Sequence, residues 1–407
     1  MKAYSGRIRA MSALRTRRVA VLPVAWALIA LYAAVPAGRR LSAAAIDAAD
    51  QQQPKTPAVS QAALRKLAEP WPSAEELAER RLAAERRPLF SGVDAFPFTL
   101  TADFKAINKD RKVEGKTPYP GVITLPDGGG TKTLHVKLLT RGHFRLRASS
   151  CSFVPLRVEF TKEELAGTIF EGQKAIKLIT HCQSDREYEQ YIMREYLTYR
   201  ALNLLTPRSF RARLTQVSYV QSSETKPMIA RLGMFLEDDD DVARRMEGRI
   251  MELPRAVFKD VDQDMLTLMM AFEYMIGNTD YSIYALHNVR LVRLQDRKTY
   301  TVPYDFDMSG LVNASYAIPA RDFNIKSVKD RVYRGPCRPL EEVEPILANF
   351  RTKKAEIIAL FENFPELSRE QKRDAKDYLE EFFRDLDRPS DVNRIFVSGK
   401  CTTKSTM

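Results

Sequence analysis

Apolar and polar residues alternate along much of the first half of the chain, which is the pattern of half-buried β-strands. A hairpin is expected around Asp127–Gly130, because an Asp-Gly turn there separates two alternating runs. Further strands are expected over 96–104, 155–160, 174–180, 212–220 and 227–237. This part of the chain is therefore predicted to be rich in β-structure.

After residue 240 the apolar residues recur every three or four positions, which is the spacing of helices. Helices are predicted over 262–277, 341–363 and 369–386, and short strands over 288–294 and 300–306. One long helix is also predicted within the β-rich part, from Ser184 or Asp185 to about Leu205. A β-rich half thus precedes a helix-rich half, and the sequence contains no internal repeat.

The segment ahead of these elements has a different composition. Residues 38–72 are rich in Ala, Gln and Pro and predict a flexible tether. Ser73 and Glu76 then have the spacing of a capping box, so a charged surface helix is expected to begin there and to end near Arg87–Pro88.

The amino terminus combines arginines with an apolar segment, Val19–Ala37, which is typical of a secretory signal. Cleavage is expected after Ala37 or within Ser42–Ala45. A signal anchor is the alternative, because about 20 apolar residues can span a bilayer. Either way the protein is expected to be exported: periplasmic, extracellular, or anchored in a membrane and facing outside. No other segment is expected to contact the membrane.

The formal charge of +12 does not by itself indicate a nucleic-acid partner. Residues 1–50 carry eight Lys and Arg against two Asp, which accounts for half of the excess. A nucleic-acid-binding domain concentrates its charge on the face that meets phosphate. No nucleic acid is therefore expected as a partner; a nucleic-acid binder, as a third reading, would require steeply salt-dependent affinity from the remaining residues.

Four cysteines, at 151, 182, 337 and 401, have no spacing typical of a zinc site. If the strands 155–160 and 174–180 pair antiparallel, Cys151 and Cys182 come to the same end of the ladder. We therefore predict a Cys151–Cys182 disulfide. Cys337 and Cys401 could also pair, although nothing in the sequence sets their distance.

Lys177 lies in the run KAIKLIT, where a strand lysine amid apolar residues could reach the phosphates of a nucleotide. Glu195 follows on the long helix and could orient the lysine, because a buried ammonium needs a partner. Glu187 and Glu189 are competitors for that role. The alternatives are a solvent-facing lysine and a solvated glutamate.

Two polar segments after residue 276 predict a catalytic and metal-binding pair. In GNTDYSIYALHN, Asp280 could take or orient the proton of an attacking hydroxyl and Asn288 could offer a neutral oxygen to Mg²⁺. In PYDFDMSG, Asp305 follows an apolar strand, and Asp307 is a second metal candidate. A helix C-cap at Gly277 and an ordinary β-turn are the alternatives for these two segments.

Two further segments are weaker candidates for nucleotide contacts. Arg141, in TRGHFR, could clamp phosphate, although a plain hairpin end explains the segment as well. The acidic run Glu237–Asp241 is expected to be a solvated turn. In a two-lobed nucleotide-binding protein it would lie at the crossover, where Leu236, Glu237 and Asp238 could contact adenine through their backbone.

The order of these parts (strand lysine, helix glutamate, crossover, Asp…Asn loop and strand-end Asp) is that of a kinase. GNTDYSIYALHN, YTVPYDFD and GMFLEDDDDVARRM resemble segments of the kinase-like family of spore-coat protein H, with a more distant likeness to HipA-type kinases. The resemblance covers about residues 135–315. It implies ATP-dependent phosphorylation of proteins. The chain departs from protein kinases in three ways: it has no HRD, an Asp-to-Asn interval of eight residues, and no GxGxxG ahead of Lys177.

These observations predict an α+β, bilobal, protein-kinase-like fold: a signal or anchor (1–45), a tether and surface helix (46–90), a β-rich N-lobe (91–238), a helical C-lobe (239–398) and a tail (399–407). The expected activity is transfer of the γ-phosphate of ATP, with Mg²⁺ or Mn²⁺, to a hydroxyl on a protein or glycan. The alternative is a catalytically inactive secreted pseudokinase that acts as a structural or binding protein.

Overall fold

The computed structural model describes residues 60–112 and 117–403. The strands are β1 (Phe96–Ala102), β2 (Tyr119–Asp127), β3 (Gly130–Thr140), β4 (Leu156–Phe160), β5 (Ala175–Ile179), β6 (Ala212–Gln221), β7 (Pro227–Leu236), β8 (Gly248–Ile250), β9 (Val289–Leu294) and β10 (Thr299–Pro303). The helices are α2 (Gln61–Ala68), α3 (Ala74–Glu85), α4 (Phe104–Ile107), α5 (Glu187–Leu205), α6 (Asp239–Arg245), α7 (Gln263–Ile276), α8 (Leu340–Glu362), α9 (Arg369–Leu386) and α10 (Pro389–Val392). Short 3-10 turns and a π-helical turn at Asn393–Ser398 complete these elements.

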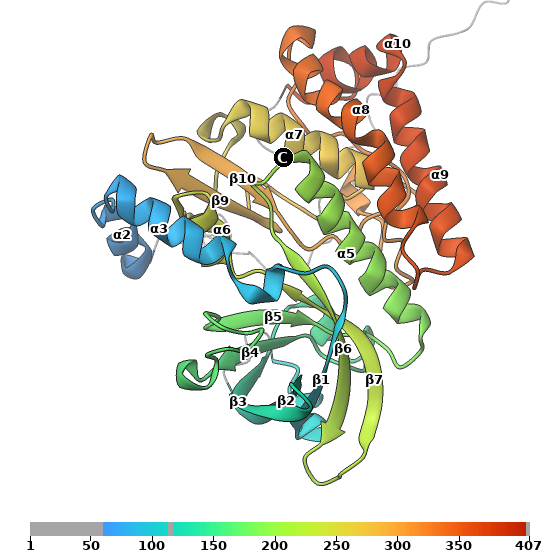
Figure 1. Cartoon of the computed structure of the whole chain (residues 1–407). Helices are drawn as coiled ribbons and strands as arrows, with labels where there is room; N and C mark the ends of the chain where they lie inside the picture. Colours follow the sequence, from blue (N-terminus) through green and yellow to red (C-terminus); the bar gives the residue numbers. More distant parts are fainter. Residues whose placement is uncertain (1–59, 113–116, 404–407) are drawn as a thin grey trace, which may run out of the picture. The chain divides into compact units, whose positions relative to one another are not determined.

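Strands β1 to β7 form a closed barrel in the order β1-β2-β3-β4-β5-β7-β6 (Figure 1). Most neighbours pair antiparallel, as in the β2–β3 hairpin around Gly128 and Gly129. The closing pair, β1 and β6, is parallel over seven positions, from Phe96 opposite Thr215 to Ala102 opposite Gln221. The barrel is therefore a mixed one, and its closure leaves no sheet edge between β1 and β6.

The predicted bilobal, protein-kinase-like fold is wrong. The expected strands exist, with bounds within a few residues of the predicted ones, but β1 and β6 close them into a barrel, while β10, β9 and β8 form a separate three-stranded sheet. Alternation of apolar residues predicts that a segment is a strand, whereas the choice of neighbour depends on packing between distant segments. The local pattern therefore could not predict closure.

The barrel has a core of its own, built from one face of each strand. On β3 the buried residues are Leu134, Val136 and Leu138, which alternate with exposed or half-exposed polar neighbours. Phe98 and Phe235 stack across the interior with their ring centroids 5.7 Å apart. The alternation noted in the sequence thus marks the inward face of the strands.

A second core lies between the helices and the three-stranded sheet. The long helix α5 packs against β6 and β7 on one side and against α8 on the other, and so connects the barrel to the helical region (Figure 1). Twelve of its nineteen residues are buried, which a surface helix would not show. Helix α7, whose first turn is capped by Asp262, contributes another nearly all-buried helix to this core.

Both cysteine pairs form disulfides. Cys151 and Cys182 are bonded with their Cα atoms 4.6 Å apart, at the end of the antiparallel β4–β5 ladder, so this prediction is confirmed. Cys337 is bonded to Cys401, which ties the residues after α10 back to the segment ahead of α8. Two disulfides are consistent with an oxidising compartment.

The amino-terminal arm agrees in part with expectation. Ser73 and Glu76 form the predicted capping box at the start of α3. Residues 61–68, expected within a flexible tether, form helix α2 instead, capped by Ser60. The expected signal or anchor at 1–45 and the tether up to residue 59 lie outside the described residues. No helix within 60–112 and 117–403 is both long and apolar enough to cross a bilayer.

The first prediction concerns the Cys151–Cys182 disulfide. Its loop spans 31 residues of sequence, so replacing both cysteines by serine is expected to lower the free energy of unfolding by about 3 kcal/mol. Urea denaturation of the variant and the parent under non-reducing conditions measures this difference. An unchanged denaturation midpoint would contradict it.

The second prediction concerns His181, which is buried beside Phe153 at 4.4 Å between ring centroids. Burial, with the charges of Arg231 and Arg145, lowers the pKa of His181 to about 3 from 6.5. Since the unfolded chain then binds the proton first, stability is fully present above pH 6.5 and is lost as the pH falls toward 3.

Replacing His181 by Phe removes this pH dependence. At pH 4.5 the parent is expected to have lost about 2.5 kcal/mol more stability, relative to pH 7.5, than the variant. Denaturation at the two pH values measures the difference, with the exposed His143→Gln as the matched control. Parallel pH profiles for the parent and His181→Phe would refute the prediction.

Candidate functional site

A cavity of about 610 Å³ lies where four separate segments meet. These are the loop after β3, strand β5, the loop after α7 and the segment after β10. Its volume is in the range of small-molecule sites. Six of the residues predicted from the sequence line it: Arg141, Lys177, Asp280, Asn288, Asp305 and Asp307.

Lys177 lies in the middle of β5, opposite Leu236 of β7. Its ammonium group forms an ion pair with Asp239 at 2.6 Å and lies 4.9 Å from the centre of the Tyr304 ring and 5.6 Å from that of Phe210. Burial lowers the pKa of Lys177, and the neighbouring Asp239 opposes this effect. The lysine is thus held between aromatic rings and a carboxylate at the wall of the cavity.

Asp239 is the partner of Lys177, and it also binds Arg290 of β9 at 2.7 Å. Burial disfavours its charge, but Lys177 and Arg290 together lower the pKa of Asp239 to about 2. The acidic run is therefore not a solvated turn: Asp238 caps helix α6, and Asp239 joins two cations. The run of aspartates followed by Arg244 and Arg245 is a helix signature that the sequence contained.

Glu195 lies on α5 and is buried, as its predicted role requires, but it is not among the residues that line the cavity. Burial, then the negative charges of Asp307 and Asp305, raise the pKa of Glu195 well above its usual value. No contact with Lys177 is found among the described residues. Glu195 therefore belongs to an acidic group with the two aspartates.

Asp305 and Asp307 follow β10 and complete this acidic group. Burial, followed by the charge of Asp305, raises the pKa of Asp307 to about 7. The hydroxyl of Tyr316 donates a hydrogen bond to Asp307 at 3.1 Å. Carboxylates in this arrangement repel one another, and a bound cation would relieve the repulsion.

Asp280 is placed by the end of helix α7. Gly277 adopts the left-handed conformation (φ 65°) that ends the helix, and a Cβ atom there would lie 1.9 Å from the Tyr378 hydroxyl, so only glycine fits. The side chain of Asn278 then accepts a hydrogen bond from the Asp280 amide at 3.0 Å. The C-cap interpretation of Gly277 is correct, and the turn it makes brings Asp280 to the cavity.

The carboxylate of Asp280 has two partners. His287 lies 3.2 Å from one oxygen, and the Asn288 amide donates to the other at 3.2 Å and to the Asp280 carbonyl at 2.7 Å. The hydrogen bond with Asp280 raises the pKa of His287. Sequence reasoning assigned no role to His287, although it lies directly before Asn288.

Three residues that line the cavity, Leu286, Asn288 and Asp305, have positive φ angles of 51°, 54° and 67°. Such angles are costly for residues with a Cβ atom, and particularly so for leucine. Backbone strain of this kind concentrates at functional sites, where the surrounding structure holds it in place. The strain is an argument for function that does not depend on the charges.

The predicted cation ligands, Asn288, Asp305 and Asp307, all line the cavity. Among residues 60–112 and 117–403 no group of three or more His, Cys, Asp or Glu is arranged to hold a metal. The predicted set, Asn288, Asp305 and Asp307, has two carboxylates and one amide. Mg²⁺ in nucleotide sites commonly takes one or two carboxylates and completes its shell with water and phosphate oxygens.

The crossover residues are less open than expected. Leu236 is buried at the end of β7, and the Glu237 carboxylate is enclosed by Arg211 at 2.6 Å and Arg245 at 2.8 Å. The Glu237 amide donates to the Arg211 carbonyl, so it is already used. Asp238 lines a second cavity, of about 640 Å³, that shares Lys177 with the first.

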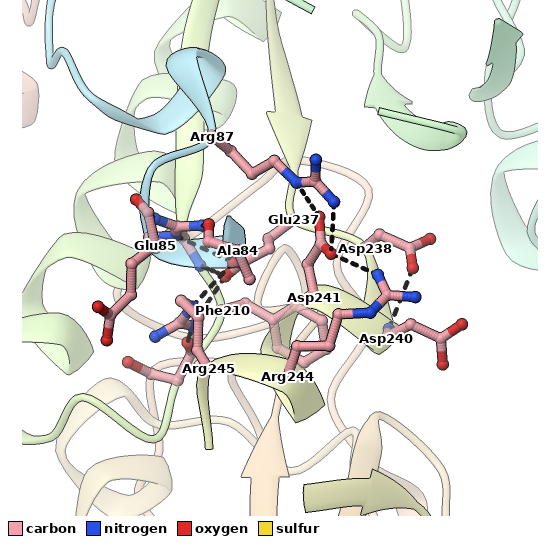
Figure 2. Close-up of polar contacts among 12 residues, drawn as sticks. Ala84, Glu85, Arg87, Phe210, Glu237, Asp238, Asp240, Asp241, Arg244 and Arg245 are labelled. Carbon is pink, nitrogen blue, oxygen red and sulfur yellow. Dashed lines mark hydrogen bonds and ion pairs between the residues drawn. The ribbon is translucent and has the colours of Figure 1, made fainter. Parts of the chain in front are cut away.

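Figure 2 shows how this crossover is fixed. Asp241 binds both Arg87, at 3.2 Å, and Arg244, at 2.5 Å, next to the Glu237–Arg245 pair (Figure 2). Asp241 and Glu237 are buried, so each needs such partners. The network connects the residues after α3 to α6, and so fixes the position of Asp239 at the second cavity.

No protein-family model matches the chain. No curated protein matches its sequence.

The third prediction concerns Asp239. Its replacement by Asn leaves Lys177 and Arg290 facing each other without a counter-charge, which is expected to lower the free energy of unfolding by about 3 kcal/mol. Urea denaturation measures this. Asp240→Asn is the matched control, because the half-exposed pair of Asp240 with Lys66 at 3.7 Å is expected to contribute less than about 1 kcal/mol. Equal effects of the two changes would contradict the prediction.

Proposed function

We propose that this protein is an exported phosphotransferase that moves the terminal phosphate of a nucleoside triphosphate, with a divalent cation, to a hydroxyl of a protein or glycan. The observation that carries the proposal is the convergence of Lys177, Asp280, Asn288 and Asp305 on one cavity from segments far apart in the sequence. Cations and carboxylates that meet at one cavity are the combination that phosphoryl transfer uses.

Lys177 and Arg141 hold the phosphates in this proposal. No hydrogen bond or ion pair of the Arg141 guanidinium is found in the described part of the chain, so its donors are free to bind phosphate oxygens in the fork geometry of arginine. Lys177 lies on the same cavity but is paired with Asp239. Asp239 keeps this buried ammonium charged and in place.

Asn288, Asp305 and Asp307 hold the divalent cation. When bound, Mg²⁺ or Mn²⁺ neutralises charge on the phosphates that are transferred and left behind. The two aspartates supply hard oxygen ligands from the residues after β10, and Asn288 is fixed by its bonds to Asp280. Glu195 is buried near the aspartates and influences their charge. The role of partner to Lys177, first expected for Glu195, belongs to Asp239.

Asp280 receives or orients the proton of the acceptor. As the hydroxyl oxygen bonds to the terminal phosphorus and the bond to the nucleoside diphosphate breaks, the proton passes to the Asp280 carboxylate. This carboxylate is about half exposed at the cavity, so a hydroxyl can reach it. His287 and Asn288 fix its orientation.

Export is the remaining part of the proposal. It rests on the two disulfides and on the apolar segment Val19–Ala37 that follows several arginines. An acceptor on an exported protein or on a surface glycan fits this location.

One observation favours the alternative, a secreted binding protein without turnover. Both carboxylate oxygens of Asp280 already have partners, His287 and Asn288, and a base whose oxygens are occupied accepts a proton less readily. In that case the cavity would bind a nucleotide and transfer nothing.

The fourth prediction separates these two functions with the full chain. Magnesium-dependent ATP binding is measured by calorimetry, and transfer of labelled phosphate to the chain itself and to a generic protein acceptor is measured in parallel. Asp280→Ala is expected to reduce transfer at least 100-fold and to leave ATP affinity within about threefold. Asp305→Ala is expected to weaken magnesium-dependent binding at least tenfold and to abolish transfer.

Asp264→Ala is the matched control, because this aspartate lies on the first turn of α7 with its side chain 78% exposed. It is expected to change neither quantity. ATP binding without transfer by the parent chain would favour the binding protein. Absence of magnesium-dependent nucleotide binding would refute both.

A further inference from the structure

The loop that carries Asp280 rests on a buried arginine that the function proposed above does not use. Arg334, 6% exposed, donates from one terminal nitrogen to the carbonyl oxygens of Thr279, at 3.0 Å, and Tyr281, at 2.5 Å. These two carbonyls belong to the residues on either side of Asp280. The arginine therefore binds the backbone of the candidate base from both directions.

Aromatic rings hold the guanidinium in this position. It lies 4.4 Å from the centre of the Tyr281 ring and 4.7 Å from that of Phe323. Burying a cation is costly, and a cation at two ring faces and two carbonyls recovers part of the cost. The geometry allows the side chain little freedom.

The segment that carries Arg334 is itself tied down. Cys337 is bonded to Cys401, and the Cys337 amide donates to the Thr402 carbonyl at 3.0 Å. The Thr402 amide in turn donates to the Gly335 carbonyl at 2.9 Å. The disulfide and this short parallel bridge fix the backbone beside Arg334 to the residues after α10.

The other side of the loop is held by α7. Asn278 accepts a hydrogen bond from the Asp280 amide, and the side chain of Glu273 of α7 is buried close to Asn278. Burial raises the pKa of Glu273 to about 8, while Asn278 and the charge of Arg334 oppose this rise. Among the described residues Arg334 forms no ion pair, and its hydrogen bonds go to the Asp280 loop.

We propose that Arg334, held in place by the Cys337–Cys401 disulfide, is a positioning residue that fixes Asp280 at the cavity for the acceptor hydroxyl. The effect on catalysis rests on the proposed phosphotransfer, whereas the restraint of the loop by Arg334 does not depend on that function. Without Arg334, the loop between Asn278 and Ser282 loses the two hydrogen bonds that the carbonyls of Thr279 and Tyr281 accept. Asp280 then samples positions that do not meet the acceptor.

The test compares Arg334 with a neighbour that anchors the same segment elsewhere. Arg338 donates to the Gln263 carbonyl at 2.8 Å and to the Thr267 hydroxyl at 2.5 Å, both near the start of α7, and it has no contact with the Asp280 loop among the described residues. Arg338 also pairs with Asp264 and Glu342, so its loss removes more bonds than the loss of Arg334, all of them at a distance from Asp280. Arg338→Gln is the matched control for Arg334→Gln.

The fifth prediction has a kinetic and a structural part. In the full chain, Arg334→Gln is expected to lower kcat at least tenfold with KM for ATP within twofold, because phosphate binding by Lys177 and Arg141 is unaffected. Arg334→Lys, which can still donate to both carbonyls, is expected to recover most of kcat. The double variant Cys337→Ser/Cys401→Ser is expected to lose kcat in the same way, and Arg338→Gln to keep it.

Hydrogen exchange of the peptide covering 277–283 supplies a measurement that does not need activity. Exchange is expected to be at least tenfold faster in Arg334→Gln and unchanged in Arg338→Gln. If the parent chain transfers no phosphate, the proposed function fails, and the exchange comparison alone then tests whether Arg334 restrains the Asp280 loop. Equal exchange in Arg334→Gln and Arg338→Gln, or equal losses of kcat in these two variants, would overturn the positioning role of Arg334.

Discussion

The carboxylate of Asp239 lies between two cations, Lys177 on strand β5 of the barrel and Arg290 on strand β9 of the small sheet. Asp239 favours the charged form of Lys177 against the effect of burial, and it is the ion-pair partner of Arg290. Asp239 is in turn fixed at the start of α6, whose neighbours Glu237 and Asp241 are enclosed by arginines. One carboxylate, which lines the second cavity, therefore joins the barrel, the crossover and the small sheet.

The acidic group has the reverse problem: its negative charges repel one another, and Arg141 and Arg145 offset this only in part. Glu195 on α5 is buried with Asp305 and Asp307, and burial together with mutual repulsion raises the pKa values of Glu195 and Asp307. The positive φ angles of Asn288 and Asp305 add backbone strain at the same place. Strain and charge repulsion persist in proteins where ligand binding offsets them. In the proposed function, a divalent cation with phosphate would neutralise the acidic group.

Much of the site could be predicted from sequence because its chemistry depends on residue type. Asp280 and Asp305 follow apolar segments that end in turns, and both line the cavity as the pattern suggested. The partner of Lys177 could not be predicted in this way. Glu195 and Asp239 are both carboxylates at a plausible sequence distance, and only the path of the chain after β7 brings Asp239, rather than Glu195, to the lysine.

The sequence by itself determined the barrel strands, the long helices and the Cys151–Cys182 disulfide, since alternation, helical spacing, capping residues and turn glycines act within a few residues of one another. The tertiary structure alone decided that β1 pairs with β6 to close a barrel, and that side chains of the acidic run bind distant cations. Both depend on contacts between segments more than 50 residues apart, such as Phe96 with Thr215 and Lys177 with Asp239. Such pairings are selected by the packing of the whole fold, and a local pattern is compatible with more than one of them.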